Sequence, residues 1–252
     1  MSINKVLSDD EIIEIKRCVD DPIYMIENFI KIHHPINGVI PFKLFDYQQS
    51  LIQDYQDNNS VIGVVGRQVG ATTCSIIYLL WYAMFNPNSN ILITAPRYKE
   101  SLEIMKRIRF SYESLPDYLK EGTKYYSMER IGFDNNSTIE VDTITENTGR
   151  GETISILYVS DFAFAPPKIA YEFWRSICPT LSTGGKCFIA SAPSSEKESQ
   201  FEQIFKNTKN NGFYPITVHW SQVPGRDSKW AAKERASLGN EVFLREHCNQ
   251  FV

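Results

Sequence analysis

The residues best suited to chemistry lie in a glycine-rich turn at 61–77, with the sequence VIGVVGRQVGATTCSII. An apolar run, a glycine-rich turn and a helical stretch together form an arrangement in which backbone N–H groups and the positive end of a helix bind phosphate. Against the pattern G-x-x-x-x-G-K-[ST], Val65 replaces the first glycine and Ala71 replaces the lysine. The turn therefore indicates a phosphate-binding loop without its lysine, for which Arg67 could supply the positive charge.

A second apolar run, ISILYVSDFAF at 154–164, ends in groups that could serve a metal ion. Nucleotide-hydrolysing proteins place a carboxylate on a neighbouring strand, where it holds magnesium or orients the attacking water. Asp161 is the only carboxylate in this run and follows Ser160 directly. Taken alone, Asp161 could equally be a loop residue or a helix cap. Together with the turn at 66–73, it favours a nucleotide site.

The elements that must position these residues follow a regular alternation from Ser60 onward. The predicted strands cover 61–66, 90–96, 154–160, 186–193 and 213–220, and the predicted helices cover 72–85, 99–114, 167–178 and 199–207. Buried strands that alternate with helices are typical of a parallel sheet, so the sequence predicts an α/β fold. We also expect an inserted β-ribbon at 124–144, with a turn at 134–136, and two closing helices at 230–236 and 241–248.

The residues before this alternation predict a helical segment. Ser8 to Glu11 form a capping-box pattern at the start of a helix that runs to residue 30, with a break at Asp21–Pro22. A loop is expected at 33–38 and another helix at 47–55. We therefore expect 1–58 to be a helical segment of the same domain and 59–252 to be its core.

Composition excludes several classes of protein. With 42% hydrophobic and 22% charged residues among 252, the chain is neither disordered, collagenous nor a coiled coil. The longest apolar run, 76–85, is too short to span a membrane, and no secretory signal precedes it. Five cysteines without a C-x-x-C pair disfavour disulfides and zinc, and a net charge of −4 disfavours a surface that coats nucleic acid. The sequence predicts a cytosolic protein without a membrane partner.

In their order and spacing, these motifs resemble the ATPase half of a large terminase, the DNA-packaging motor subunit of tailed bacteriophages, most closely the contractile-tailed kind. The resemblance runs from DDPIYMIENFIKIHHPINGVIPFKLFDYQQSLI through GRQVGATT, RGETISILYVSDFAF and IASAPSS to FLREHCNQF. It implies a P-loop ATPase of the additional-strand, RecA-like kind, with ATP and Mg²⁺ as ligands. The implied reaction is in-line attack of water on the γ-phosphate of ATP.

The resemblance also implies a nucleotide-binding set. FDYQQ matches the family's adenine-recognition segment, in which Tyr47 packs near the base and Gln48 bonds its edge. GRQVGATT matches the phosphate loop, in which Thr72 contacts magnesium. The loop residues expected to contact nucleotide are Gly66, Arg67, Gln68, Val69, Gly70, Ala71, Thr72 and Thr73.

Two further positions match family motifs outside the loop. Arg150 matches an arginine finger offered to a neighbouring subunit's nucleotide, which makes Arg150, Arg67 and Asp161 the expected catalytic residues. Residues 190–193, ASAP, match the coupling motif that senses the γ-phosphate, and Ser191 is the hydroxyl there.

Three positions depart from the family pattern. The loop lysine is Ala71, the metal-binding aspartate is Ser160 and the catalytic glutamate is Asp161. We expect Ser160, Asp161 and Thr72 to face the metal, and we hypothesise that Asp161 serves the metal more than the attacking water. The site is then an engineered, disabled one, a natural variant that uses Arg67, or a nucleotide-binding assembly module with little or no hydrolysis. A helicase-like ATPase is a further alternative, but 252 residues leave no room for its second RecA-like domain.

The resemblance implies several partners. They are double-stranded DNA, the portal protein, the small terminase subunit and neighbouring copies in a ring, in the cytoplasm of the host cell. The predicted helix near 97–110 carries basic residues that either contact DNA phosphates or face solvent: Arg97, Lys99, Lys106, Arg107 and Arg109. In the family a nuclease domain follows the ATPase domain, and we expect it to be absent because the chain stops at Val252, where that domain would start.

Overall fold

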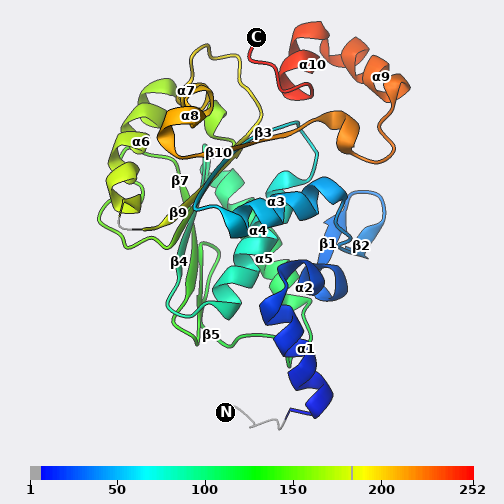
Figure 1. Cartoon of the computed structure of the whole chain (residues 1–252), viewed down its shortest axis with the longest axis vertical. Helices are drawn as coiled ribbons and strands as arrows, with labels where there is room; N and C mark the ends of the chain where they lie inside the picture. The colour runs from blue at the N-terminus through cyan, green and yellow to red at the C-terminus, as the bar shows by residue number, and fades with distance from the viewer. Residues whose placement is uncertain (1–6, 183) are drawn as a thin grey trace.

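The centre of the molecule is a sheet of parallel strands, as the alternation of apolar runs and helices predicts (Figure 1). The computed structural model describes residues 7–182 and 184–252. The parallel strands are β3 (Ser60–Val65), β4 (Asn90–Ala95), β8 (Ile156–Ser160), β9 (Lys186–Ser191) and β10 (Tyr214–Val218). Strands β3, β4, β8 and β9 are buried along almost their whole length. The polar residues of this part of the chain therefore lie in the loops that follow these strands.

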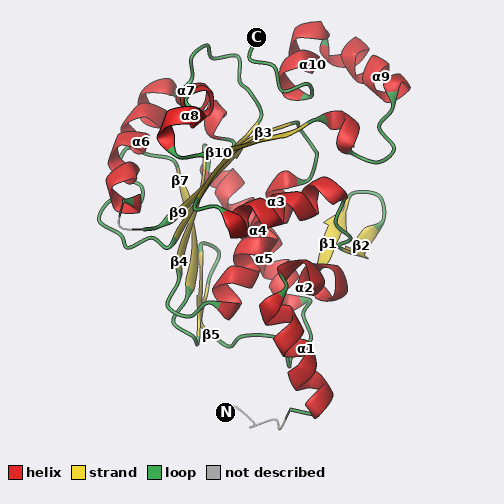
Figure 2. Ribbon diagram, viewed as in Figure 1, coloured by secondary structure: helices red, strands yellow, loops and turns green. Residues whose placement is uncertain are grey.

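The order of these strands confirms the predicted fold class. They run β10-β3-β9-β8-β4 across the sheet. Figure 2 shows these strands at the centre of the molecule, with helices on both sides. Strand β9 therefore lies between β3, which leads into the glycine-rich turn, and β8, which leads into Asp161. This inserted strand defines the additional-strand, RecA-like arrangement.

The expected β-ribbon at 124–144 is present, and it also joins the main sheet, which the sequence did not predict. Strands β5 (Thr123–Tyr126), β6 (Arg130–Phe133) and β7 (Thr138–Thr143) are antiparallel to one another, with a turn at 134–136 as predicted. Strand β7, however, pairs in parallel with β4 and so extends the main sheet. The sequence did not indicate this pairing, because the residues of β7 alternate between buried and more exposed, whereas the other parallel strands read as continuous apolar runs.

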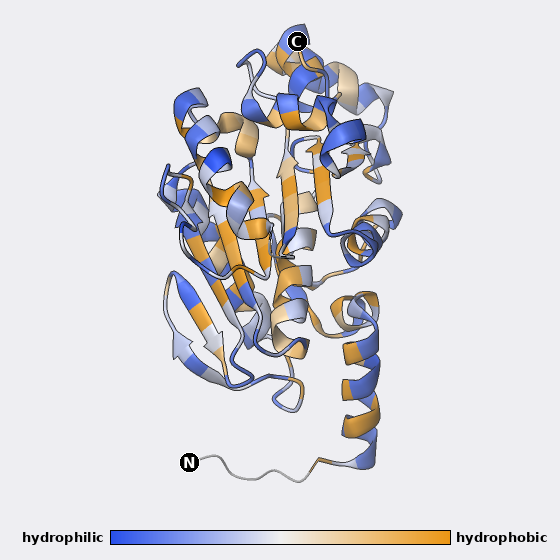
Figure 3. Ribbon diagram, turned by 60° about the vertical axis from the view of Figure 1, so that its left-hand side comes forward, coloured by the Kyte–Doolittle hydropathy of each residue, from blue (hydrophilic) through white to orange (hydrophobic). Residues whose placement is uncertain are grey.

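Helices cover both faces of the sheet. One face is packed by α3 (Asp46–Asp57), α4 (Ala71–Phe85) and α5 (Tyr98–Glu113), and the other by α6 (Pro167–Leu181) and α7 (Gln200–Lys206). Helix α4 is buried on almost every side, which its continuous apolar sequence requires. Figure 3 shows the hydrophobic strands enclosed between helices whose outer surfaces are largely hydrophilic.

The N-terminal segment forms helices α1 (Asp9–Asp20) and α2 (Pro22–Phe29), separated at Asp21 as predicted. The Ser8 and Glu11 side chains form the expected capping box. The loop expected at 33–38 is a hairpin of β1 (Lys31–His34) and β2 (Gly38–Pro41), which its short polar sequence did not indicate. The first six residues of the expected segment 1–58 lie outside the described residues.

The chain ends in a helical segment beyond the glycine-rich turn (Figure 1). Short helices α8 (Thr208–Asn211) and η2 (Trp220–Gln222) flank β10, and α9 (Ser228–Leu238) and α10 (Asn240–Glu246) follow. A further short helix, η1 (Phe162–Phe164), comes directly after Asp161. Within the described ranges, no helix has the length and apolar character needed to cross a membrane.

Candidate functional site

The predicted site residues follow neighbouring strands at one edge of the sheet. Val64 at the end of β3 pairs with Ser191 of β9, and Ser160 at the end of β8 pairs with Ala190. Because adjacent strands lie about 4.8 Å apart, the turn after β3 and the carboxylate after β8 are separated by roughly 10 Å. Ligands of open parallel sheets bind at this carboxyl edge, between loops that follow different strands.

The turn between β3 and α4 has the backbone of a phosphate-binding loop. Gly70 is left-handed, with φ of 75°, and a Cβ atom there would lie 2.7 Å from the Gln48 Nε2. Gly66 is enclosed by backbone, since its Cβ would lie 3.2 Å from the carbonyl oxygen of His247. Gln68 is also left-handed, with φ of 58°, which is uncommon for a residue with a side chain. The glycines at 66 and 70 are therefore required by the loop geometry.

The carbonyl oxygens of this loop are turned toward the protein and held there. The Val69 carbonyl accepts hydrogen bonds from the Tyr47 hydroxyl at 2.6 Å and from the Gln48 Nε2 at 3.3 Å. Arg226 donates to the carbonyls of Gln68 at 2.8 Å and of residue 67 at 3.4 Å. In the part of the chain that the structure describes, the N–H groups of residues 68–70 have no acceptor. Such a set of free N–H groups at a helix start forms an anion-binding concavity.

Tyr47 and Gln48 lie beneath the loop as its supports. Both are buried, and burial raises the pKa of Tyr47 to about 12, which keeps its hydroxyl a neutral donor. The Gln48 Oε1 accepts from the Phe45 N–H at 3.0 Å, so both ends of this amide are engaged. The centroid of the Phe45 ring lies 5.7 Å from that of the Tyr47 ring. Phe45 is exposed and Tyr47 is buried, so Phe45 is the more accessible of the two rings for stacking against a base.

Arg67 is joined to the C-terminal helix α10. Its Nη1 lies 2.8 Å from the Glu246 Oε2, and its backbone N–H donates to the Glu246 carbonyl at 2.7 Å. The hydrogen bond that Arg67 donates to Glu246 raises the pKa of Arg67, so the guanidinium stays charged. The positive charge predicted to replace the missing lysine is thus present at the loop.

The acidic side of the site consists of Ser160 and Asp161. Asp161 is left-handed, with φ of 53°, and its N–H continues the sheet ladder to the Ala190 carbonyl at 2.8 Å. The Ser160 hydroxyl donates to the Asp161 Oδ2 at 3.2 Å. Burial at the base of the site raises the pKa of Asp161, while this bond and the charges of Arg67 and Arg107 oppose the rise.

The oxygen atoms near the loop fit magnesium held together with a nucleotide. No three His, Cys, Asp or Glu side chains in the described ranges converge to hold a metal unaided. Magnesium with ATP needs only one or two protein oxygens, because phosphates and waters supply the rest. The hydroxyls of Thr72 and Ser160 both lie near the buried Tyr158 hydroxyl, which has no hydrogen-bond partner among the described residues. Burial raises the Tyr158 pKa to about 12.

Two predicted residues are separated from the open part of the site. Ser191 is fully buried, and its hydroxyl accepts from the Ala163 N–H at 3.1 Å and donates to the Ala192 carbonyl at 2.8 Å. Arg150 lies on the opposite face of the sheet from α4, in a surface depression that it shares with residues 172–179 of α6. The residues that line this depression include none from the turn at 66–73.

The sequence did not reveal Arg226, Glu246 or Arg107 as parts of this site. Arg226 and Glu246 reach the loop across 158 and 179 residues of chain. No local motif marks them, since each contact depends on how the C-terminal segment folds back over β3. Arg107 was predicted only as one of several basic residues on a helix.

Comparison with known proteins gives one consistent result for the fold. No protein-family model matches the chain. The ATPase domain of the large terminase of Thermus phage P74-26 superposes with a TM-score of 0.70 at 19% identity, over 84% of this chain and 95% of that one. The HK97 bacteriophage large terminase gives a TM-score of 0.70 at 14% identity, over 94% of this chain and 55% of that one.

A third similar structure carries a nucleotide. It is the large terminase of a thermophilic bacteriophage in complex with ADP, with a TM-score of 0.65 at 12% identity, over 83% of this chain and 54% of that one. The chain thus has the fold of phage large terminase ATPase domains. It spans about half the length of the latter two terminase chains.

Proposed function

We propose that this chain is the ATP-hydrolysing domain of a viral DNA-packaging motor, a terminase large subunit. The observation that carries the proposal is the loop at 66–70, whose carbonyls are held inward and whose N–H groups are left without acceptors. A backbone ordered in this way binds a polyphosphate at little further entropic cost.

In this proposal each residue has a defined task. The N–H groups of 68–70 bind the phosphates. Thr72, Ser160 and Asp161 would hold magnesium, which would supply positive charge against the phosphate groups. Arg67 adds positive charge once it releases Glu246. Asp161 orients the attacking water, although its side chain is one methylene shorter than that of glutamate. Ser191 supports the end of β9, the strand that lies between the phosphate loop and Asp161.

The wider role is inferred from the fold and the resemblance together. Hydrolysis would drive double-stranded DNA into a procapsid when a ring of subunits assembles at the portal protein with the small terminase subunit, in the host cytoplasm. Arg150 lies on the surface remote from its own loop, which suits an arginine finger offered to a neighbouring subunit.

One alternative has a specific observation in its favour. Ala71 and Ser160 replace groups that bind phosphate and metal, so the same fold could serve as a nucleotide-binding assembly module with impaired hydrolysis. Thermal unfolding with and without Mg²⁺ and ATP tests the common part of both proposals. Saturating nucleotide should raise the midpoint in either case, since a ligand of the native state stabilises it. An unchanged midpoint at millimolar nucleotide would contradict both.

A further inference from the structure

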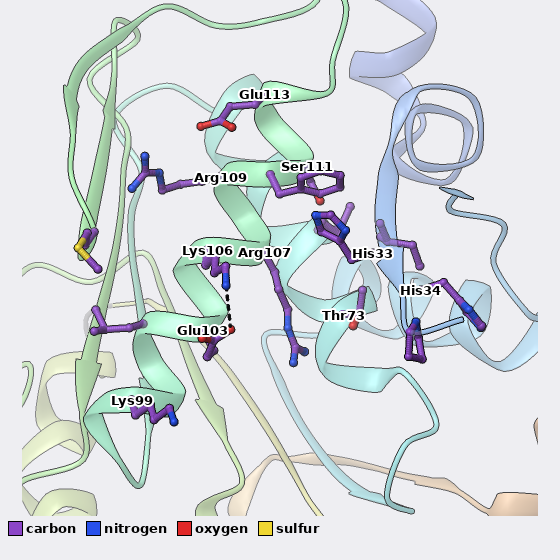
Figure 4. A pocket seen from close by; sticks show the side chains of 16 residues that line it. His33, His34, Thr73, Lys99, Glu103, Lys106, Arg107, Arg109, Ser111 and Glu113 are labelled. Carbon is purple, nitrogen blue, oxygen red and sulfur yellow. Dashed lines mark ion pairs between the residues drawn. The ribbon is translucent and has the colours of Figure 1, made fainter. Parts of the chain in front are cut away.

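A groove of about 1190 Å³ runs along helix α5 from the phosphate-loop helix to the β1–β2 hairpin. It is lined by Thr73 on the first turn of α4 and by His33 and His34 of the hairpin, which Figure 4 shows beside Thr73. Through Thr73 the groove adjoins the helix that follows the glycine-rich turn. Its cations are Lys99, Lys106, Arg107 and Arg109.

Two of these cations already have partners. Lys106 pairs with Glu103 at 3.9 Å, and Arg109 lies over the Tyr126 ring at 4.4 Å. Two carboxylates, Glu103 and Glu113, also line the groove. This mixture of charges suits contact with one phosphate better than a continuous phosphate backbone.

Arg107 differs from its neighbours in where its side chain lies. Like Lys99, it forms no hydrogen bond and no ion pair among the described residues, but its side chain extends from α5 into the space beside Thr73 (Figure 4). It is also close enough to Asp161 to favour ionisation of that carboxylate. An unpaired guanidinium beside the phosphate-loop helix, within electrostatic reach of Asp161, is available to a phosphate bound at the start of that helix.

We propose that Arg107 contacts the γ-phosphate of ATP bound to the same chain and supplies the positive charge that Ala71 lacks. The inference rests on the proposed function. It assigns the γ-phosphate contact to a residue outside the loop. Arg67 does not make Arg107 redundant, because Arg67 is held by Glu246 on the other side of the loop. A planar guanidinium can donate two parallel N–H···O bonds to one phosphate group, a fixed bidentate geometry that the ammonium of a lysine does not provide.

The test is calorimetric titration of the chain with Mg²⁺ plus either a non-hydrolysable ATP analogue or ADP. A contact to the γ-phosphate predicts that Arg107→Ala weakens binding of the ATP analogue by about 10- to 100-fold and leaves ADP binding within about two-fold. Arg107→Lys should restore part of the difference. Lys106→Ala, the adjacent groove residue already paired with Glu103, is the matched control and should change neither affinity.

The outcomes separate this inference from the proposed function. Equal weakening of both nucleotides, or no weakening of either, would overturn the role of Arg107 while leaving nucleotide binding intact. A native chain that binds neither nucleotide would overturn the proposed function and this inference with it. Unchanged thermal midpoints of the variants without nucleotide would show that the differences do not come from misfolding.

Discussion

Arg67 of the phosphate loop and Glu246 of helix α10 form an ion pair of 2.8 Å between residues 179 positions apart in the chain. The Glu246 side chain is 13% exposed, whereas that of Arg67 is 62% exposed. The C-terminal segment thereby neutralises the charge of Arg67. In the proposed function, nucleotide would compete with Glu246 for this guanidinium.

Substitution of Glu246 should therefore strengthen nucleotide binding. Glu246→Gln removes the competing charge, and since the pair is partly exposed we expect ATP affinity to rise by about two- to five-fold. Calorimetric titration measures the change. Glu241→Gln is the control, because Glu241 pairs with Arg245 on the same helix at 3.5 Å. Weaker binding by Glu246→Gln would show that Glu246 helps to form the site.

The bond from Tyr47 to the loop can be tested by removing one oxygen. Tyr47→Phe should lower the free energy of unfolding by about 1 kcal/mol and should weaken ATP binding, because the Val69 carbonyl then keeps only the longer bond from Gln48. Urea unfolding and nucleotide titration measure the two effects. Tyr24→Phe, which removes a bond to Glu14 far from the loop, should leave ATP affinity unchanged. Unaltered binding by Tyr47→Phe would argue against a loop-supporting role.

The length of the acidic side chain at 161 should limit hydrolysis. Asp161→Glu extends the carboxylate by one methylene toward the attacking water, and we expect phosphate release to rise by about 10-fold or more. Release of inorganic phosphate at saturating ATP is the measurement, with Asp161→Asn as the variant that should abolish it. No increase with glutamate would refute misplacement of the base.

Arg150 should act between subunits. In dilute solution Arg150→Ala should bind ATP as the native chain does, because Arg150 lies away from its own loop. At concentrations where subunits associate, it should lose any acceleration of hydrolysis, for which arginine fingers account for factors of about 10³ to 10⁵. Arg175→Ala, in the same depression and paired with Glu172 at 3.6 Å, is the control. Loss of ATP affinity in dilute Arg150→Ala would contradict a role in trans.

The sequence predicted the elements whose signals are local. The strands of the sheet, helix α4 and the glycine-rich turn each follow from apolar runs and glycine positions within about 20 residues. The β1–β2 hairpin and the parallel pairing of β7 with β4 were missed, because strands of four residues show no distinct periodicity and the sequence of a strand does not reveal its partner.

The candidate site shows the same division. Gly66, Gly70 and Asp161 could be identified because each stands in a motif directly after a buried strand. Arg226 and Glu246 could not, since their contacts with the loop depend on tertiary folding of the C-terminal segment. The left-handed conformations of Gln68 and Asp161 were equally hidden, because neither residue type demands them.

The most direct test of the account is calorimetric titration of the chain with Mg²⁺ and ATP, with phosphate release followed in the same sample. We predict magnesium-dependent binding accompanied by release, with both strongly reduced by Arg67→Ala. Binding without release would favour the impaired module over the motor. The absence of any binding at millimolar ATP would contradict the central claim that the loop at 66–70 is a nucleotide site.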